Sequence, residues 1–486
     1  MHALTPVVQT KSGAVVGRPV DDETFRYLGI PFAEPPIGDL RFAAPVPAEP
    51  WDGTRACTTY SATARQIEPP FTIIPEPVVP GDDCLSVNVC TPDPGAAGLP
   101  VLVWIHGGGF TNGSPASPWY DGRSFCRDGV VVVTVGYRLG AIGFLELEDA
   151  ASNRGVRDWL LALEWVQDNI AAFGGDPANV TIAGQSAGGM ACATLLAVPR
   201  ADGLFRRAML LSGAASSVGT LDDAQEFARG FAERLAVAPT VAAIGGVPTE
   251  RILEVQLRSG GPTRKTGAGP EGFIKQLRQA LRYAPVVDGE LVPTPPLDAL
   301  RAGASGDREV LVGATAEETN AMLRAMRSDA VEDGVALALS AGGIDASYRT
   351  SIDGPPVEVL AQASTDFMFR VPAVRVAEAR AASGGAPTFL YDFTWRGPTM
   401  GAVHCLDIPF GFDLLDAEGV APVAGDAPPQ ALADDVHRAW LGFVADGDPG
   451  WARYDLDERS TMVFDAPPRI AADWHRASRK AFEGVR

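Results

Sequence analysis

The sequence has few of the groups that hold metal ions or nucleic acids. It contains five histidines and six cysteines in 486 residues, and none of them has zinc-ligand spacing. Its 40 Lys and Arg residues are outnumbered by 60 Asp and Glu residues, which gives a formal charge of −20. A chain of this charge repels nucleic acids and anionic membranes. We therefore expect no metal, no cofactor and no nucleic-acid partner.

Long apolar runs are also missing. No stretch approaches the ~18 residues of a membrane-spanning helix, and residues 1–11 lack the basic start and apolar core of a secretory signal. These absences predict a cytoplasmic protein without a membrane anchor. The cysteines do not form a disulfide framework in so long a chain, and we expect free thiols.

Nucleotide-binding glycine patterns are absent, but glycines flank a serine at residues 184–188, Gly-Gln-Ser-Ala-Gly. A β-branched run precedes this pentapeptide, and a stretch of small residues that can form a helix follows it. The pattern indicates a strand, a sharp turn and a helix with Ser186 at the apex, the arrangement of a nucleophilic serine. An ordinary glycine-rich turn between a strand and a helix is the alternative interpretation.

A second glycine cluster, residues 107–109, follows an apolar strand that begins near Leu99. Backbone N–H groups of such a loop can stabilise the oxyanion that forms when a serine attacks an ester. We expect Gly108, Gly109 and Ala187 to donate these hydrogen bonds. A flexible loop tip or a phosphate-binding loop remains the alternative.

A nucleophilic serine needs a histidine base. His404 is the best candidate, because it follows Ser186 in the chain and lies in a loop that leads into apolar residues. His106 precedes the glycine cluster and is expected to brace that loop. The remaining histidines are His2, His437 and His475.

A carboxylate must orient the histidine. Glu317 and Glu318 follow a short apolar strand at residues 310–312, so either could lie at the same sheet edge as Ser186. Position alone does not choose between them.

Periodicity predicts two core elements. Apolar residues recur at helical spacing, which favours a buried helix face, and residues 130–135 form a β-branched run typical of a central strand. The residues of the helix face are Trp159, Leu163, Val166, Ile170 and Phe173.

Taken together, these motifs resemble the type-B carboxylesterases, the α/β-hydrolases that include para-nitrobenzyl esterases, liver carboxylesterases and cholinesterases. Further similar segments extend over nearly the whole chain. They are residues 28–42, 83–89, 137–144, 173–181 and 284–289.

The resemblance implies an α/β-hydrolase fold, with a large, mostly parallel twisted sheet flanked by helices. Residues 1–486 are expected to form a single catalytic domain, with insertions at about 215–280 and 320–385 that cap an active-site gorge.

By resemblance, Ser186 is the nucleophile and His404 the base, and the family's acid follows a strand-end glycine by five residues, which selects Glu318. Gln185 replaces a glutamate that is common in the family, and we expect it to take no direct part in the chemistry. Cys84 matches a cysteine that is bridged in secreted relatives, and a bridge to Cys57 would be out of the family's register, although spacing leaves it open.

For the substrate pocket we expect Phe110, Leu281 and Met322. The loop before Cys84 has no tryptophan that could stack on a quaternary ammonium, which disfavours choline esters. Leu281 stands where cholinesterases narrow the acyl pocket with phenylalanine, so bulkier acyl or aromatic groups are expected.

The sequence thus predicts a serine carboxylesterase of small-molecule esters, as a monomer or small homo-oligomer. Two alternatives stay open. One is a hydrolase of amides or polyester-type aryl diesters with the same triad, and the other is a non-catalytic interaction module.

Overall fold

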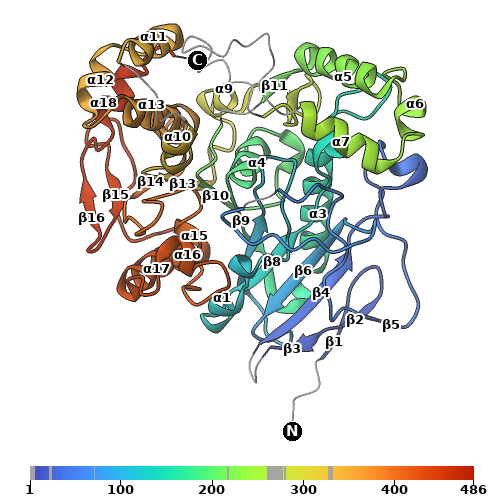
Figure 1. The fold of residues 1–486 in the computed structure, drawn as a ribbon. Helices are drawn as coiled ribbons and strands as arrows, with labels where there is room; N and C mark the ends of the chain where they lie inside the picture. The colour runs from blue at the N-terminus through green and yellow to red at the C-terminus, as the bar shows by residue number, and fades with distance from the viewer. Residues whose placement is uncertain are drawn as a thin grey trace.

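An 11-stranded sheet forms the centre of the molecule (Figure 1). Its strand order is β16-β15-β14-β13-β10-β9-β7-β8-β6-β4-β3. Neighbouring strands from β8 through β15 run parallel, and antiparallel strands complete both edges. The computed structural model describes residues 6–20, 24–69, 72–215, 218–259, 277, 281–326 and 332–485.

The strands of this sheet are β3 (Arg18–Pro19), β4 (Phe25–Pro31), β6 (Ser86–Thr91), β7 (Leu99–Ile105), β8 (Val131–Val135), β9 (Gly175–Gln185), β10 (Arg207–Leu211), β13 (Glu309–Thr315), β14 (Thr388–Phe393), β15 (Thr461–Phe464) and β16 (Arg469–Ala471). A 3-stranded sheet is made of β1 (Val7–Gln9), β2 (Ala14–Val16) and β5 (Thr54–Ala56), and a 2-stranded sheet of β11 (Gly219–Thr220) and β12 (Val286–Val287).

The helices are α1 (Arg123–Arg127), α2 (Gly140–Phe144), α3 (Arg154–Asn169), α4 (Ala187–Leu195), α5 (Leu221–Leu235), α6 (Val241–Gly245), α7 (Thr249–Ser259), α9 (Pro296–Arg301), α10 (Asn320–Met326), α11 (Glu332–Gly342), α12 (Ser347–Ser351), α13 (Pro356–Thr365), α14 (Val371–Ser383), α15 (Asp407–Gly411), α16 (Ala421–Ala424), α17 (Gln430–Asp446) and α18 (Arg476–Ala481). Short 3-10 turns are η1 (Gly38–Leu40), η2 (Pro118–Tyr120), η3 (Ile170–Phe173) and η4 (Pro199–Ala201), and η7 (Asp366–Arg370) is a π-helix.

The central strands are buried on both faces, because helices cover each side of the sheet. Side chains alternate along a strand, so Val131 and Val133 of β8 join one core while Val132 joins the other. The first core is closed by α3, α4 and α14, and the second by α1, α15 and α17. The predicted central strand is therefore confirmed.

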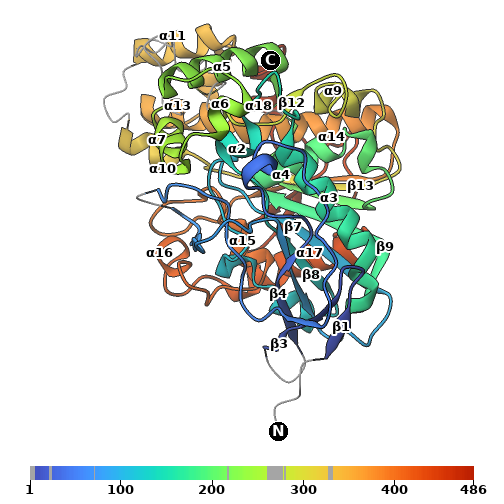
Figure 2. The ribbon, with the colours of Figure 1, turned by 90° about the vertical axis from the view of Figure 1, so that its right-hand side faces the viewer.

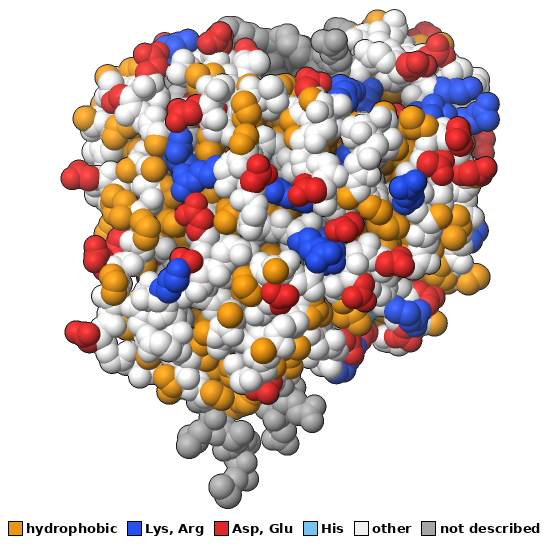
Figure 3. All heavy atoms as spheres, turned by 180° about the vertical axis from the view of Figure 1, so that it is seen from behind, with side chains coloured by type: hydrophobic (Ala, Val, Ile, Leu, Met, Phe, Trp, Pro, Cys, Tyr) orange, Lys and Arg blue, Asp and Glu red, His pale blue; other side chains and the backbone are white. Residues whose placement is uncertain are grey.

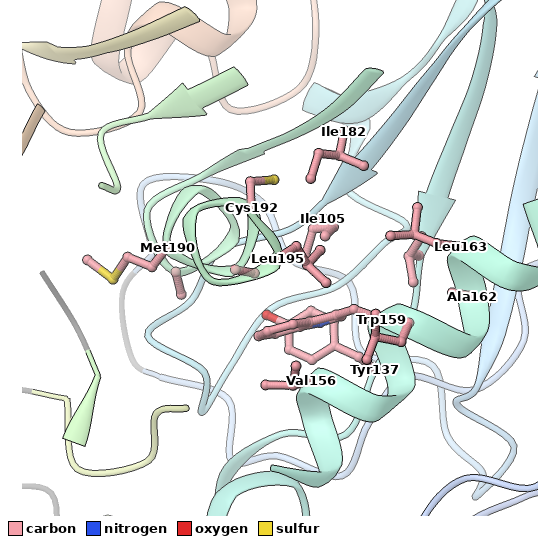
Figure 4. Close-up of a cluster of buried hydrophobic side chains, with 14 of the residues drawn as sticks. Ile105, Tyr137, Val156, Trp159, Ala162, Leu163, Ile182, Met190, Cys192 and Leu195 are labelled. Carbon is pink, nitrogen blue, oxygen red and sulfur yellow. The ribbon is translucent and has the colours of Figure 1, made fainter. Parts of the chain in front are cut away.

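The predicted helix face is confirmed as well. Trp159, Leu163 and Val166 of α3 are at most 1% exposed, and the stripe continues into η3. Figure 4 shows Trp159 and Leu163 between α3 and the sheet, while Met190, a member of the same core, projects from the opposite side of α4. This packing holds α4 against the sheet. It thereby fixes the turn that joins α4 to the end of β9.

Two groups of helices lie beyond the carboxyl ends of the parallel strands, on either side of α4 at the top of Figure 1. One contains α5, α6 and α7, and the other runs from α10 to α13 with α18. The second group has a small core of its own, which includes Leu339, Tyr348, Val359 and Phe482. Apart from α18, these helices fall within the two predicted insertions, and residues 216–217, 260–276, 278–280 and 327–331 of those insertions lie outside the described residues. Their function as a cap stays a prediction.

Acidic and basic side chains alternate with small apolar areas on the face seen in Figure 3. Within the described ranges, no helix has the length and apolar character needed to cross a membrane. All six cysteines are free thiols, as predicted, including Cys57 and Cys84.

Candidate active site

Ser186 lies at the sharp turn between β9 and α4, as predicted. Its φ and ψ of 57° and −124° are unusual for a residue with a side chain, and such strain is found mainly where function requires it. Ser186 N–H donates to Leu211 O of the neighbouring strand at 2.9 Å, which fixes the turn on the sheet. The serine is partly exposed, whereas the residues on both sides of it are buried.

The flanking glycines of this turn are required by close packing. A Cβ on Gly188 would lie 1.9 Å from Ile105 O, and one on Gly184 would lie 2.4 Å from the carbonyl carbon of Gly188. Neither contact is sterically possible. The glycines therefore let the strand, the turn and the helix approach closely enough to hold Ser186 at the tip.

The second glycine cluster lies beside Ser186. A Cβ on Gly107 would be 3.2 Å from Ser186 Cβ, and Gly108 and Gly109 have positive φ values of 101° and 61°. Within the described part of the chain, no group accepts a hydrogen bond from the N–H of Gly108, Gly109 or Ala187. Unpaired N–H groups next to a serine hydroxyl can bind an oxyanion.

His106 supports this loop, as predicted. Its Nδ1–H donates to Gly107 O at 2.9 Å, and its ring stacks on Tyr137 at a centroid distance of 4.5 Å. Burial lowers the pKa of His106 to about 4, so the ring is neutral at ordinary pH. His106 therefore has a structural role.

The structure brings His404 and Glu318 together. His404 Nδ1 forms a short hydrogen bond with Glu318 Oε2, and the other oxygen of Glu318 accepts from Thr315 N–H at 2.8 Å. Glu318 is only 2% exposed. A buried carboxylate on Nδ1 fixes the ring tautomer in which Nε2 carries the lone pair, as a general base requires. Ser186 Oγ makes no hydrogen bond to His404 among the described residues, and such contacts commonly tighten only when substrate binds.

Two effects act on the acidity of His404. Burial lowers its pKa, but the neighbouring Cys405 and Glu318 outweigh burial, and the pKa of His404 lies well above the ordinary 6.5. Burial raises the pKa of the Cys405 thiol, so this sulfur is neutral near neutral pH. The Glu318 carboxylate is thus the charge that stabilises the protonated ring.

Glu317 has a different environment. It pairs with Arg324 and Arg396 at 3.0 Å each, and it accepts from Ala402 N–H at 3.1 Å. These contacts join it to the loop that carries His404 rather than to the imidazole. The geometry therefore supports Glu318 over Glu317.

Gln185, which was expected to take no direct part in the chemistry, contacts the candidate base directly. Its Nε2 lies 3.1 Å from Nε2 and 3.4 Å from Nδ1 of His404. Its Oε1 is buried and has no hydrogen-bond partner among the described residues. Phe369 of η7 packs on the same imidazole, with centroids 4.9 Å apart. The only feature of the sequence that pointed to the contact between Gln185 and His404 was the position of Gln185 next to Ser186. No feature of the sequence pointed to the contact between Phe369 and His404.

The predicted pocket residues are placed in three different environments. Leu281 lines two cavities and lies next to Gly109. Phe110 is not a pocket residue, because its ring is fully buried against Phe144 and Trp159, where it anchors the glycine loop to the core. Met322 is 55% exposed on α10 and lines neither of these cavities.

The larger cavity, of about 910 Å³, is bounded by Met190 of α4, Leu281 and Met368 of η7. The smaller, of about 300 Å³, lies at the glycine loop and is bounded by Gly109, Leu281 and Ile67. Both volumes are in the range of small-molecule pockets. In the part of the chain that the structure describes, no group of His, Cys, Asp and Glu side chains is arranged to hold a metal ion.

Comparison with known proteins agrees with this geometry. The carboxylesterase family model matches residues 4–340 and 348–476. The para-nitrobenzyl esterase of Bacillus subtilis is 34% identical over 491 residues, which cover 96% of each chain. The phenmedipham hydrolase of Pseudarthrobacter oxydans is 31% identical over 97% of each chain. A crystal structure of a Geobacillus stearothermophilus carboxylesterase matches with a TM-score of 0.86 and 33% identity, over 98% of this chain and 99% of that one. The chain therefore belongs to the carboxylesterase family, has the α/β-hydrolase fold and is a carboxylic-ester hydrolase.

Proposed function

We propose that this protein is a general serine carboxylesterase in which Ser186, His404 and Glu318 form the catalytic triad. The observation that carries this proposal is the strained serine at the tip of the β9–α4 turn, directly after Gln185, which contacts a histidine whose Nδ1 is held by a buried carboxylate.

The reaction follows from these positions. His404 Nε2 takes the proton of the Ser186 hydroxyl, and Oγ bonds to the ester carbonyl carbon. The carbonyl oxygen, now negative, accepts hydrogen bonds from the N–H groups of Gly108, Gly109 and Ala187. When the intermediate collapses, the ester C–O bond breaks, His404 gives its proton to the departing alcohol, and an acyl-enzyme remains. Water then attacks the acyl-enzyme in the same way, which releases the acid and restores Ser186.

A Ser186→Ala variant tests the nucleophile. We expect kcat on para-nitrophenyl butyrate to fall by about a thousandfold or more, and labelling by a fluorophosphonate probe to disappear, because only an activated serine reacts. Ser347→Ala, at an exposed position of α12, is the matched control and should label like the wild type. Labelling that persists in Ser186→Ala would assign the reactive serine elsewhere.

We further propose that acyl groups larger than acetyl are accepted, and that the larger cavity receives them. Its volume and its apolar wall of Met190, Leu281 and Met368 support this proposal.

Kinetics with para-nitrophenyl acetate, butyrate and benzoate test this acyl preference. Leu281→Phe should lower the benzoate-to-acetate ratio of kcat/KM by about tenfold, in the range that shape changes in an apolar pocket produce. A wild type that strictly prefers acetate would contradict the proposal. The cytoplasmic location and the monomeric or small homo-oligomeric state stay predictions.

A further inference from the structure

One part of the larger cavity is lined by apolar side chains, and another part is lined by arginines. Met190, Met368 and Val371 line its apolar part, and arginines from α9, α14 and the C-terminal region line the rest (Figure 2 shows these elements close together). These arginines are Arg301, Arg375, Arg459 and Arg479.

The apolar part adjoins the candidate catalytic residues. Met190 N–H donates to Ser186 O at 3.0 Å, and the Met190 side chain projects from the side of α4 opposite α3 (Figure 4). Met368 precedes Phe369, whose ring packs on His404. An acyl group on Ser186 would therefore enter the cavity from its apolar side.

Most of the arginines are neutralised by carboxylates. Arg459 pairs with Glu378, Arg479 pairs with Asp473 at 2.9 Å, and Arg301 pairs with Asp298 at 2.9 Å. Of the acidic groups on the cavity wall, Asp298 and Glu378 are thus engaged, and Glu483 is exposed.

Arg375 differs from the other three arginines of the cavity in its partners. Its Nη2 donates to two carbonyl oxygens, Phe482 O at 2.8 Å and Val485 O at 2.6 Å, and no carboxylate pairs with it among the described residues. Burial lowers the pKa of Arg375, the nearby Arg301 cation lowers it further, and the Glu378 carboxylate, which pairs with Arg459, opposes this only in part. A half-buried guanidinium with a second cation nearby and no bound carboxylate is stabilised by an anion.

We propose that this cavity accepts acyl groups with a carboxylate at their far end, and that Arg375 binds this carboxylate. The natural substrates would then include half-esters of aliphatic dicarboxylic acids. This proposal rests on the proposed function, and the chemical step is the same: the ester C–O bond breaks, and the distal carboxylate stays intact. In a chain of net charge −20, which repels anions in general, a cation inside the cavity would select this class of anionic ester.

Two substrates of equal chain length test the idea, para-nitrophenyl octanoate and the mono-para-nitrophenyl ester of octanedioic acid. We expect Arg375→Met to lower kcat/KM for the half-ester by about tenfold or more, mainly through KM, because a charge-assisted contact is lost. The same variant should change octanoate hydrolysis by less than about twofold, which also shows that the active site remains folded. Arg375→Lys should recover part of the loss.

Arg438→Met removes an exposed arginine of α17 that pairs with Asp435, and it should leave both substrates unaffected. Equal effects of Arg375→Met on the two esters would overturn the proposal, and so would a wild type that hydrolyses octanoate but not the half-ester. If the wild type hydrolyses neither ester and Ser186 does not label, the proposed function itself fails.

Discussion

Two adjacent glutamates with opposite surroundings show how the environment of a residue decides its role. Glu318 is held by Thr315 N–H and directed at His404, whereas Glu317 is paired with two arginines. Glu318→Gln should reduce kcat by about 10⁴-fold, because an amide on Nδ1 favours the wrong tautomer of the histidine. Steady-state kinetics on para-nitrophenyl butyrate measure this loss.

Glu317→Gln is the matched control and should retain most of the activity, since it weakens ion pairs that do not touch the imidazole. A larger loss in Glu317→Gln than in Glu318→Gln would reverse the assignment.

Gln185 gives a prediction about pH. His404 must be neutral to accept the serine proton, so kcat/KM falls as the pH drops through the pKa of this histidine. A carboxylate in place of the Gln185 amide, about 3 Å from the ring, would favour the protonated ring and raise this pKa. Gln185→Glu should therefore move the acidic limb of the kcat/KM profile upward by about one pH unit.

The Gln185→Met variant distinguishes the effect of the added charge from the effect of losing the amide. It removes the amide without adding a charge, so its acidic limb should stay close to that of the wild type even if the maximal rate changes. An unshifted limb in Gln185→Glu would mean that this residue does not affect the acidity of His404.

At the scale of the element, the β9–α4 turn depends on close backbone packing. Gly188→Ala would place a Cβ 1.9 Å from Ile105 O, and overpacking of this kind typically costs about 1–3 kcal/mol or more of stability. We expect a lower melting temperature and a severe loss of activity, because the shift moves Ser186 relative to the glycine loop. Gly245→Ala in α6 meets no atom within 4 Å and should be neutral or slightly stabilising. Similar melting temperatures for the two variants would contradict the steric argument.

The elements differ in how well the sequence predicts them. The strand at residues 131–135, the α3 face and the serine turn were predictable, because each has a local pattern of period, β-branched residues or glycines. The π-helix η7 had no such signal. It is held by tertiary contacts: Tyr348 and Ser478 both donate to the buried Asp366, at 2.7 and 2.5 Å. Residues far away in the chain thus determine where η7 lies, and with it Phe369.

The same reasoning explains the error at Phe110. A residue directly after the glycine loop is close to the site in sequence, but its positive φ of 59° and the neighbouring aromatic rings direct it into the core. Sequence position indicated the loop correctly and could not indicate the direction of the side chain.

At the scale of the whole molecule, the C-terminal segment contacts the sheet through His475, whose side chain is 8% exposed and whose Nε2 lies 3.9 Å from an oxygen of Asp392 in β14. Burial, reinforced by Arg370, lowers the pKa of His475 from the ordinary 6.5 to about 3. The unfolded chain therefore binds more protons between these values, so the stability that His475 contributes is complete above about pH 6.5 and is lost as the pH falls toward 3.

Between about pH 7.5 and about pH 5, this loss amounts to about 2 kcal/mol. Urea unfolding followed by tryptophan fluorescence measures it, and other buried acids and bases cancel when the wild type is compared with His475→Gln. The wild type should lose about 2 kcal/mol more than the variant over this interval. Parallel pH dependences in the two proteins would show that His475 is not buried as a neutral ring.

The fold class and most of the candidate site were predictable for a whole-chain reason: the motifs occur in one fixed order and each lies at a strand end. The character of the larger cavity was not, because its walls come from α4, α9, η7, α14 and the C-terminal region, which meet only in the folded molecule.

The strand order has a consequence for how activity arises during synthesis. Ser186 follows β9, Glu318 follows β13 and His404 follows β14; β13 pairs directly with β14, and β10 lies between β13 and β9 in the finished sheet. A nascent chain that ends between residues 187 and 317 carries Ser186 but neither Glu318 nor His404. Serine-directed inhibitors should therefore ignore ribosome-bound fragments that end before His404, so a covalent probe would count folded enzyme rather than total polypeptide.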